Sequence, residues 1–282
     1  MIIETKNLSH VYPGNVQALK DVSIKIDEGE FTAVVGQNGS GKTTFALHLN
    51  GLLKPTEGDV VIKGMNTRNS DVEELSKMVG YVYQNPNHQL FNLTVKQELA
   101  FSLKKILSKE ETEKRLKGAI ELFGIQGILE ANPFSLNLPV KKIVAMAAIY
   151  AMKPEIFVLD EPTTGQDFGG MKLIEKAILN ISQEGKTIIV ITHDMGFVAR
   201  HAKRAIIMAD GRVIGDDEPR KIFDLSSNGI KKVLQEARIS PPQVSSLSYR
   251  LRFDYNLQRV PTDIVTPTQF ADIVSTHKLR GP

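Results

Sequence analysis

The stretch Gly36-Gln37-Asn38-Gly39-Ser40-Gly41-Lys42-Thr43-Thr44 decides how this chain folds. It follows an apolar run at 31–35, which predicts a buried strand, and it precedes residues 45–49, which predict a helix. Glycines let successive main-chain N–H groups turn inward as a nest for phosphate oxygens, and the positive end of the following helix points at the same place. This setting indicates a phosphate-binding loop, in which Lys42 reaches the β- and γ-phosphates and the Thr43 hydroxyl holds Mg²⁺. A glycine-rich turn before a helix is the alternative.

Composition narrows the class of protein. The chain has 282 residues, is 41% hydrophobic, contains no cysteine and carries a formal net charge of +3. This length predicts one large domain, with or without a small appendage. The small net charge does not indicate a nucleic-acid partner, and the lack of cysteine excludes disulfides and thiolate metal sites. The first residues do not resemble a signal peptide, and no run of about 18 apolar residues is present to span a bilayer, so a membrane role would require a partner.

An aromatic residue lies ahead of the phosphate-binding loop. Alternating apolar and polar residues predict antiparallel strands of a sheet edge at 2–9 and 22–26, and Tyr12 stands between them, before Pro13-Gly14. A ring at this place can stack on adenine, whereas the alternative is an aromatic side chain that packs on a turn. The neighbouring phosphate-binding loop favours stacking.

Gln84 occupies a strand end. Strands are predicted at 58–63 and 79–83, with a short charged helix at 71–77 between them, and Gln84 follows the second strand. Open sheets place their ligand crevice at such ends, so its amide can bind Mg²⁺ or the attacking water. A polar loop cap is the alternative.

Residues 94–152 are predicted to be mostly helical. Thr94 is expected to cap a helix that has Glu98 in its first turn, the alternating charges of 109–117 indicate a solvated face, and a further helix is expected at 140–151. Four apolar residues recur at helical spacing and predict a core-facing stripe: Val95, Leu99, Leu103 and Ile106.

Two buried strands are predicted to end in residues that can do chemistry. The run 156–159 leads into Asp160 and Glu161. The first carboxylate can orient Mg²⁺ through water, and the second can take a proton from, or orient, the water that attacks the γ-phosphate, unless both acids merely cap a loop. His193 follows the strand 187–191, where an imidazole can reach the γ-phosphate, although a lone histidine is usually structural.

The last part of the chain reads less clearly. Strands at 204–209 and 212–214 are predicted to form a hairpin through Asp210-Gly211. The pattern weakens after about residue 225, and Pro241-Pro242 marks a boundary before a small appendage.

Taken in order, these elements resemble the ATPase subunits of ABC transporters over about residues 1–225. Tyr12 matches the adenine-stacking loop of that family, Gly36–Thr44 its Walker A motif, Gln84 its Q-loop, Asp160-Glu161 its Walker B motif with the catalytic glutamate, 164–167 its D-loop and His193 its switch histidine. Within the family, the run from Gln84-Asn85-Pro86 to Phe91 and the tail segments 241–244 and 249–251 are similar to the ATPases of energy-coupling factor (ECF) importers of vitamins and metals.

The resemblance implies an α/β P-loop NTPase fold. A mixed central sheet, an antiparallel β subdomain and a helical signature subdomain at about 92–152 would form an ATPase domain over 1–225. Residues 226–282 would form a small helical C-terminal region that serves dimerisation, and a partly disordered tail is the alternative. The implied cofactors are ATP and Mg²⁺. The implied catalytic residues are Lys42, Gln84, Glu161 and His193; the implied ATP-binding residues are Tyr12, Gly36, Gln37, Asn38, Gly39, Ser40, Gly41, Lys42, Thr43 and Thr44; and the implied Mg²⁺ ligands are Thr43, Gln84 and Asp160.

The family also implies partners. Its ATPases pair head to tail, so that each ATP lies between the Walker A motif of one chain and an LSGGQ signature of the other. The pair would sit peripherally on the cytoplasmic face of the cell membrane and drive a transmembrane coupling protein and a substrate-binding membrane protein. That second protein would choose the cargo, so this sequence does not name it.

The signature departs from the family pattern. Leu136-Asn137-Leu138-Pro139-Val140 stands where LSGGQ is expected. Leu138 adds bulk where glycine lets the phosphate approach, and Pro139 removes an N–H donor, although Asn137 can still cap the helix. We therefore expect a heterodimer in which a paralogue supplies an intact signature to this chain's ATP. Self-pairing with a tolerated signature is the alternative.

Other proteins with a phosphate-binding loop have different functions. The ATPase of a conventional ABC importer, or a soluble ABC protein that acts on DNA or ribosomes, shares most of these motifs. The segment before the signature is too short for the long coiled coil of DNA-repair members, and translation factors carry two ATPase units. A P-loop kinase or GTPase would lack the Q-loop, D-loop and switch histidine together.

Overall fold

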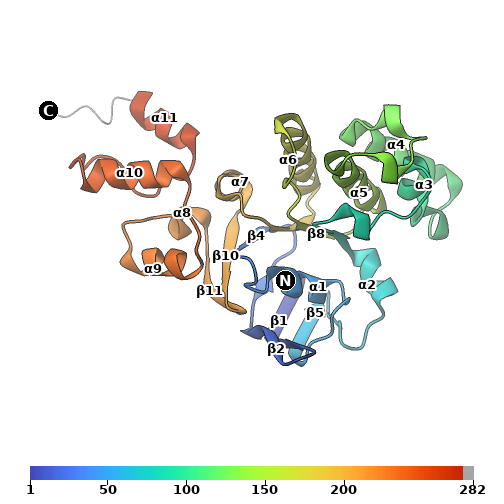
Figure 1. Ribbon diagram of the computed structural model, residues 1–282, viewed down its shortest axis with the longest axis horizontal. Helices are drawn as coiled ribbons and strands as arrows, with labels where there is room; N and C mark the ends of the chain where they lie inside the picture. Colours follow the sequence, from blue (N-terminus) through green and yellow to red (C-terminus); the bar gives the residue numbers. More distant parts are fainter. Residues whose placement is uncertain (276–282) are drawn as a thin grey trace.

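Within residues 1–275, which the computed structural model describes, the strands form two sheets (Figure 1). The central sheet has the order β11-β10-β4-β9-β8-β7, and all neighbours are parallel except β10 and β11, so the predicted mixed sheet is confirmed. The second sheet has the order β2-β1-β5-β6, with β3 also paired to β1. The strands are β1 (Ile3–Tyr12), β2 (Val16–Val22), β3 (Lys25–Ile26), β4 (Phe31–Val35), β5 (Glu57–Ile62), β6 (Met65–Asn66), β7 (Val79–Val82), β8 (Ile156–Asp160), β9 (Thr187–Ile191), β10 (Arg204–Ala209) and β11 (Arg212–Asp217).

Helices cover the sheets and extend to both sides of them. Figure 1 shows α3, α4 and α5 gathered at one side of the molecule and α9, α10 and α11 at the other. The α-helices are α1 (Lys42–Leu49), α2 (Val72–Met78), α3 (Val95–Ala100), α4 (Lys109–Phe123), α5 (Leu138–Met152), α6 (Phe168–Gln183), α7 (Met195–His201), α8 (Pro219–Ile222), α9 (Asn228–Glu236), α10 (Gln243–Phe253) and α11 (Pro267–Ser275). Short 3₁₀ turns are η1 (Pro86–His88), η2 (Leu103–Lys105), η3 (Gln126–Ile128) and η4 (Pro133–Ser135). Within the described residues, no helix is both long and apolar enough to cross a membrane.

The central strands position the ends that matter for function. Every residue of β4, β8 and β9 is buried, because both faces of this part of the sheet are covered. The three strands are parallel, and Ile191 of β9 is in register with both Val34 of β4 and Asp160 of β8. The carboxyl ends of these strands therefore meet along one edge, where Gly36, Glu161 and Thr192 follow.

The antiparallel sheet corrects the prediction for the first strands. The strand expected at 22–26 is divided: β2 ends at Val22, and β3 covers only Lys25–Ile26. Both pair with β1 antiparallel in the second sheet, where β2 is an edge strand, so the predicted antiparallel edge is confirmed. Register shifts on either side of His10 interrupt the alternation of the β1–β2 hairpin, which explains why its pattern did not predict β2.

The helical side confirms some local predictions and corrects others. Thr94 caps α3 by accepting a hydrogen bond from the Gln97 N–H, as predicted. Val95, Leu99 and Leu103 are buried, but the prediction for Ile106 was wrong, since it is 49% exposed. The reason is that α3 ends at Ala100 and a 3₁₀ turn follows, so helical spacing no longer applies. The helix expected at 140–151 begins earlier, at Leu138.

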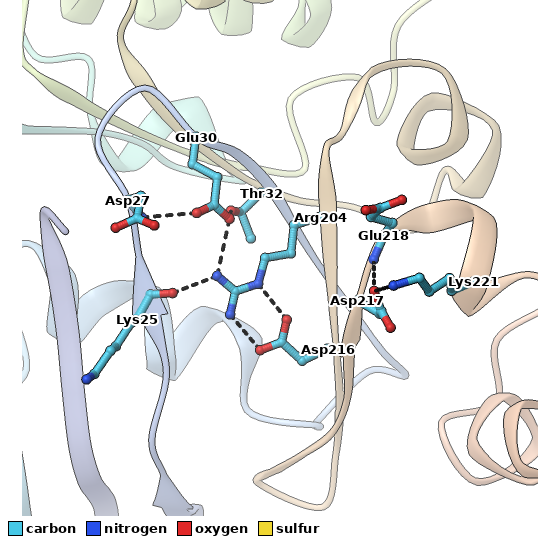
Figure 2. Close-up of polar contacts among 9 residues, drawn as sticks. All are labelled: Lys25, Asp27, Glu30, Thr32, Arg204, Asp216, Asp217, Glu218 and Lys221. Carbon is cyan, nitrogen blue, oxygen red and sulfur yellow. Dashed lines mark hydrogen bonds and ion pairs between the residues drawn. The ribbon is translucent and has the colours of Figure 1, made fainter.

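Arg204 fastens the edge of the central sheet to the strands before it. Its guanidinium donates to both carboxylate oxygens of Asp216 in β11, to the main-chain oxygen of Lys25 in β3 and to Glu30 (Figure 2). The Asp216 carboxylate raises the pKa of Arg204 above its already high value. This network joins the start of β4 to the β10–β11 hairpin, and thereby steadies the strand that carries the phosphate-binding loop.

The C-terminal helices pack on the central domain through a small apolar cluster. Val265, which precedes α11, is buried with Phe223 and Leu234 against the β4–β10 side of the central sheet. Ser245 of α10 donates to the main-chain oxygen of Ile264 at 2.8 Å. The division into regions 1–225 and 226–282 stays a prediction, and its last residues, 276–282, lie outside the described part of the chain.

Candidate active site

A pocket of about 380 Å³ opens where the carboxyl ends of β4, β8 and β9 face the turn between β1 and β2. The predicted site residues in its lining are Tyr12, Asn38, Gly39, Gly41, Lys42, Thr43, Thr44, Gln84, Asp160, Glu161 and His193. The fold thus brings together residues from five separate stretches of the sequence. Gln84 lines the pocket from the loop after β7, and its exposed side chain faces solvent as well.

Three predicted residues lie behind the pocket and shape it. Gly36 has a φ of 152°, and a Cβ there would lie 2.2 Å from the main-chain oxygen of Met208, so only glycine fits. The main-chain oxygens of Gly36 and Gln37 each accept a hydrogen bond at 2.8 Å from Lys42 Nζ. Ser40 is buried, with its hydroxyl 3.5 Å from the same nitrogen. These residues hold the loop around the lysine.

Lys42 is a buried cation at the start of α1. It is 6% exposed, and burial lowers its pKa, although the negative charges of Glu161 and Asp160 oppose that shift. Gly41 caps the helix with a φ of 99°, which glycine adopts without strain. Lys42 and the first residues of α1 line the same pocket, so a cation lies beside the helix N-terminus there, which suits a polyphosphate.

Asp160 accepts two hydrogen bonds through a single oxygen. Thr43 Oγ1 donates to Asp160 Oδ2 at 3.0 Å, and the Tyr81 hydroxyl donates to it at 3.1 Å. Burial raises the pKa of Asp160, and the two donors oppose this because they favour the carboxylate. Burial together with the Asp160 charge also raises the pKa of Tyr81 above its ordinary value. The hydroxyl of Thr43 and the carboxylate are hard oxygen donors side by side, as a Mg²⁺ ligand set requires.

Glu161 and His193 are neighbours in the lining of the pocket. Glu161 Oε1 lies 3.1 Å from His193 Nε2, and Glu161 Oε2 accepts a hydrogen bond from Thr164 Oγ1 at 2.9 Å. Glu161 is 4% exposed, whereas the His193 side chain is 49% exposed. A carboxylate held on one side and next to an imidazole on the other can accept a proton from a water molecule in the pocket.

Tyr12 lies at the far wall of the pocket. Its hydroxyl is 3.3 Å from Thr44 Oγ1, and its ring makes an edge contact with the ring of His10, with centroids 4.6 Å apart. These contacts orient the ring beside the phosphate-binding loop. Stacking on adenine stays a prediction.

The altered signature forms the first turn of α5. Asn137 caps this helix as predicted, because its side chain accepts a hydrogen bond from the Val140 N–H at 3.0 Å. Pro139 lies in the first turn, and Leu138 is 48% exposed. The turn therefore presents an apolar side chain and lacks one of the N–H groups that a helix start usually offers.

Two residues that contact Asp160 and Glu161 were not predicted from the sequence. Tyr81 reads as one more apolar residue of β7, yet its hydroxyl reaches Asp160. Lys142 reads as a polar residue of α5, yet it is 2% exposed and donates to the main-chain oxygen of Glu161. The apolar run 143–147 that follows Lys142 is a weak signal that this helix is buried on several sides.

Known proteins of one family are similar to this chain. A family model described as ABC transporter matches residues 19–164. A putative ABC transporter ATP-binding protein of Caldanaerobacter subterraneus is 39% identical over 252 residues, which cover 89% of this chain but 43% of that protein, so the chain spans less than half of its length. The energy-coupling factor transporter ATP-binding protein EcfA of Methanocaldococcus jannaschii is 39% identical over 249 residues, which cover 87% of this chain and 88% of EcfA. Among solved structures, cbiO1 from Clostridium perfringens, described as part of the ABC transporter complex cbiONQ, has a TM-score of 0.73 and 32% identity, with 88% of this chain and 98% of that chain covered.

Proposed function

The chain belongs to the ABC transporter ATP-binding family, and from that premise we propose that it is the ATP-hydrolysing motor subunit of an energy-coupling factor importer for a vitamin or a metal ion. The observation that carries the proposal is the convergence of Lys42, Asp160, Glu161 and His193 on one pocket. The name of EcfA supports the ECF class.

ATP would lie with its phosphates on the loop 36–44 and its adenine ring against Tyr12. Lys42 would neutralise charge on the β- and γ-phosphates, because its ammonium already lies inside the loop. The oxygens of Thr43 and Asp160, 3.0 Å apart, with the amide of Gln84, would hold Mg²⁺. When bound, that ion would withdraw charge from the phosphate oxygens.

Hydrolysis would depend on Glu161. Its carboxylate would orient a water molecule and take a proton from it while the water attacks the γ-phosphate. His193, 3.1 Å from that carboxylate, would hold the γ-phosphate and the acid in a fixed relation. Thr164 would keep the second oxygen of the carboxylate from turning away.

The altered signature at 136–140 favours a heterodimer. In an intact site, a serine hydroxyl and glycine N–H groups of the partner contact the γ-phosphate. Here the Asn137 side chain is engaged with Val140, and Pro139 has no N–H. Each lost charge-assisted donor costs roughly 1.5–3 kcal/mol. We therefore propose a paralogue with an intact signature as partner, which gives one competent and one degenerate ATP site.

The remaining partners follow from the same class. A transmembrane coupling protein and a substrate-binding membrane protein would complete the importer, with this subunit peripheral on the cytoplasmic face of the cell membrane. Two other functions are candidates: the ATPase subunit of a conventional ABC importer, and a soluble ABC protein. Copurification of membrane proteins from a detergent extract would exclude the soluble protein. The identity of those membrane proteins would then distinguish an ECF importer from a conventional importer.

The direct test compares ATP turnover of the purified chain alone with that of the chain plus its paralogue. We expect low turnover alone and at least a tenfold increase, about the value of one restored charge-assisted hydrogen bond, in the mixed pair. Equal turnover per ATPase chain would refute the heterodimer and leave the ATPase in place. No magnesium-dependent affinity for ATP would refute the whole proposal.

A further inference from the structure

Lys142 is a buried lysine that the chemistry above does not use. It lies in α5 and is 2% exposed. An ammonium in such a place costs free energy unless its charge and its hydrogen bonds are compensated. Its Nζ donates at 2.7 Å to the main-chain oxygen of Glu161 and at 3.0 Å to that of Thr164. The ammonium therefore binds main-chain oxygens of the loop that carries Glu161, the candidate catalytic acid.

The main chain of Glu161 needs such support. Its φ is 50°, in the left-handed region that a residue with a side chain adopts only at a cost. The Glu161 N–H donates to the main-chain oxygen of Ile191 at 2.9 Å, and Lys142 holds the Glu161 oxygen at the other end of the residue. Lys142 also holds Thr164, whose hydroxyl donates to the Glu161 carboxylate.

A second contact joins the same loop to the same helix. Gln166 Nε2 donates to the main-chain oxygen of Pro139 at 3.0 Å. The loop 161–166 is thus fastened to the first turns of α5 at two points. One of these lies in the altered signature, the part of this chain that would face the ATP held by a partner.

The charges near Lys142 also favour its ammonium form at this place. Burial lowers the pKa of Lys142, while the negative charges of Glu161 and Asp160 oppose the shift. The ammonium and the two acids therefore compensate one another in the protein interior.

We propose that Lys142 is a positioning residue for Glu161: its ammonium holds the strained main chain of the acid and couples it to the signature helix α5. The role rests on the proposed ATPase function, in which Glu161 activates water. It predicts that loss of the ammonium slows hydrolysis and loosens the loop 161–166 without weakening ATP binding, because Lys142 does not line the pocket.

The first experiment uses hydrogen exchange and needs no activity. In Lys142→Met, we expect the Glu161 amide and its neighbours at 160–166 to exchange at least about tenfold faster, because two hydrogen bonds from a charged donor are lost. Lys117→Met is the matched control, since the Lys117 side chain is 77% exposed on α4. Unchanged exchange at 160–166 in Lys142→Met would refute the positioning role.

The second experiment restores the charge on one polypeptide. The chain contains no cysteine, so Lys142→Cys offers a single thiol for alkylation in the unfolded state before refolding. Aminoethylation recreates a lysine analogue, whereas propylation leaves a neutral side chain of similar length. We expect the aminoethyl form to recover slow exchange and the propyl form not to recover it; equal behaviour of the two forms would refute the role of the charge.

The same two forms, paired with the paralogue, give the kinetic test. We expect the propyl form to lose at least about tenfold in kcat, as misplaced catalytic groups do, with a Kd for Mg²⁺-ATP within threefold of the aminoethyl form. A loss that resides wholly in Kd would overturn the proposal. Inactivity of the unmodified pair would count against the proposed function instead, and the exchange comparison would still decide whether Lys142 holds the loop.

Discussion

Glu161 Oε1 lies 3.1 Å from His193 Nε2, while the other oxygen of the same carboxyl group accepts a hydrogen bond from Thr164. The acid is 4% exposed and follows a strand that is buried throughout. Thr164 therefore orients one oxygen of the acid, while the other lies beside His193 without a hydrogen bond from any described residue, at the edge of the sheet where the phosphate-binding loop begins.

Replacing this acid separates binding from hydrolysis. We expect Glu161→Gln to lower kcat roughly 10²–10⁴-fold, because the amide cannot accept the proton from water, with the Kd for Mg²⁺-ATP within threefold. Steady-state turnover and calorimetric titration measure the two quantities. Glu155→Gln, just before the opposite end of β8 and paired with Lys63, is the control and should change neither. A variant that retains more than a tenth of wild-type turnover would exclude Glu161 as the base.

Lys42 should act on binding. We expect Lys42→Met to weaken Mg²⁺-ATP by at least about tenfold, since a charge-assisted contact to phosphate is lost and the oxygens of Gly36 and Gln37 lose their donor. Calorimetric titration checks this, with Lys77→Met as control because the Lys77 side chain is 52% exposed on α2. Wild-type affinity in Lys42→Met would mean that the loop alone binds the nucleotide.

The signature can be repaired by substitution. In the variant N137S/L138G/P139G/V140Q the sequence after Leu136 becomes Ser-Gly-Gly-Gln, and we expect turnover of the chain alone to rise at least about tenfold as the N–H donors return. Asn137→Ser alone is the matched control: serine keeps a helix cap, while Leu138 and Pro139 stay, so no gain is expected. An unchanged rate in the repaired variant, with ATP affinity intact, would show that the signature does not limit turnover.

A buried histidine makes the phosphate-binding helix sensitive to acid. His48 Nδ1 lies 2.7 Å from the Thr44 oxygen, so this nitrogen carries the proton, and Nε2 lies 3.2 Å from His10 Nδ1. Burial lowers the pKa of His48 from 6.5 to about 4. The unfolded chain thus binds the proton first as the pH falls, and the stability that the neutral ring contributes above pH 6.5 is lost between pH 6.5 and 4.

The size of this effect can be measured by urea unfolding at two pH values. From pH 7 to 4.5, His48 should account for roughly 2–3 kcal/mol of lost unfolding free energy, at about 1.4 kcal/mol per pKa unit. His48→Gln should reduce the difference between the two pH values by that amount, whereas His88→Gln, an exposed position, should not. Equal acid losses in wild type and His48→Gln would show that the ring is not the titrating group.

Much of the candidate site could be predicted because its residues lie in short, contiguous patterns. The loop 36–44 needs glycine for local reasons, because Gly39 and Gly41 have φ angles of 79° and 99°, which other residues rarely adopt. The two acids and His193 follow apolar runs, and strand ends of a parallel sheet meet at one edge. Periodicity failed where the geometry changes within a segment, as at Ile106 after the end of α3 and at the bulges near His10.

What the sequence alone determined was therefore the set of local motifs, their order and the chemistry they can support. Only the tertiary structure decided that Tyr81 bonds to Asp160, that Lys142 holds the main chain of Glu161 and that Gln166 reaches Pro139. The physical reason is that a strand or helix pattern records how often a side chain faces the interior, but not which distant atom it meets there. That partner depends on how α5, β7 and β8 pack together.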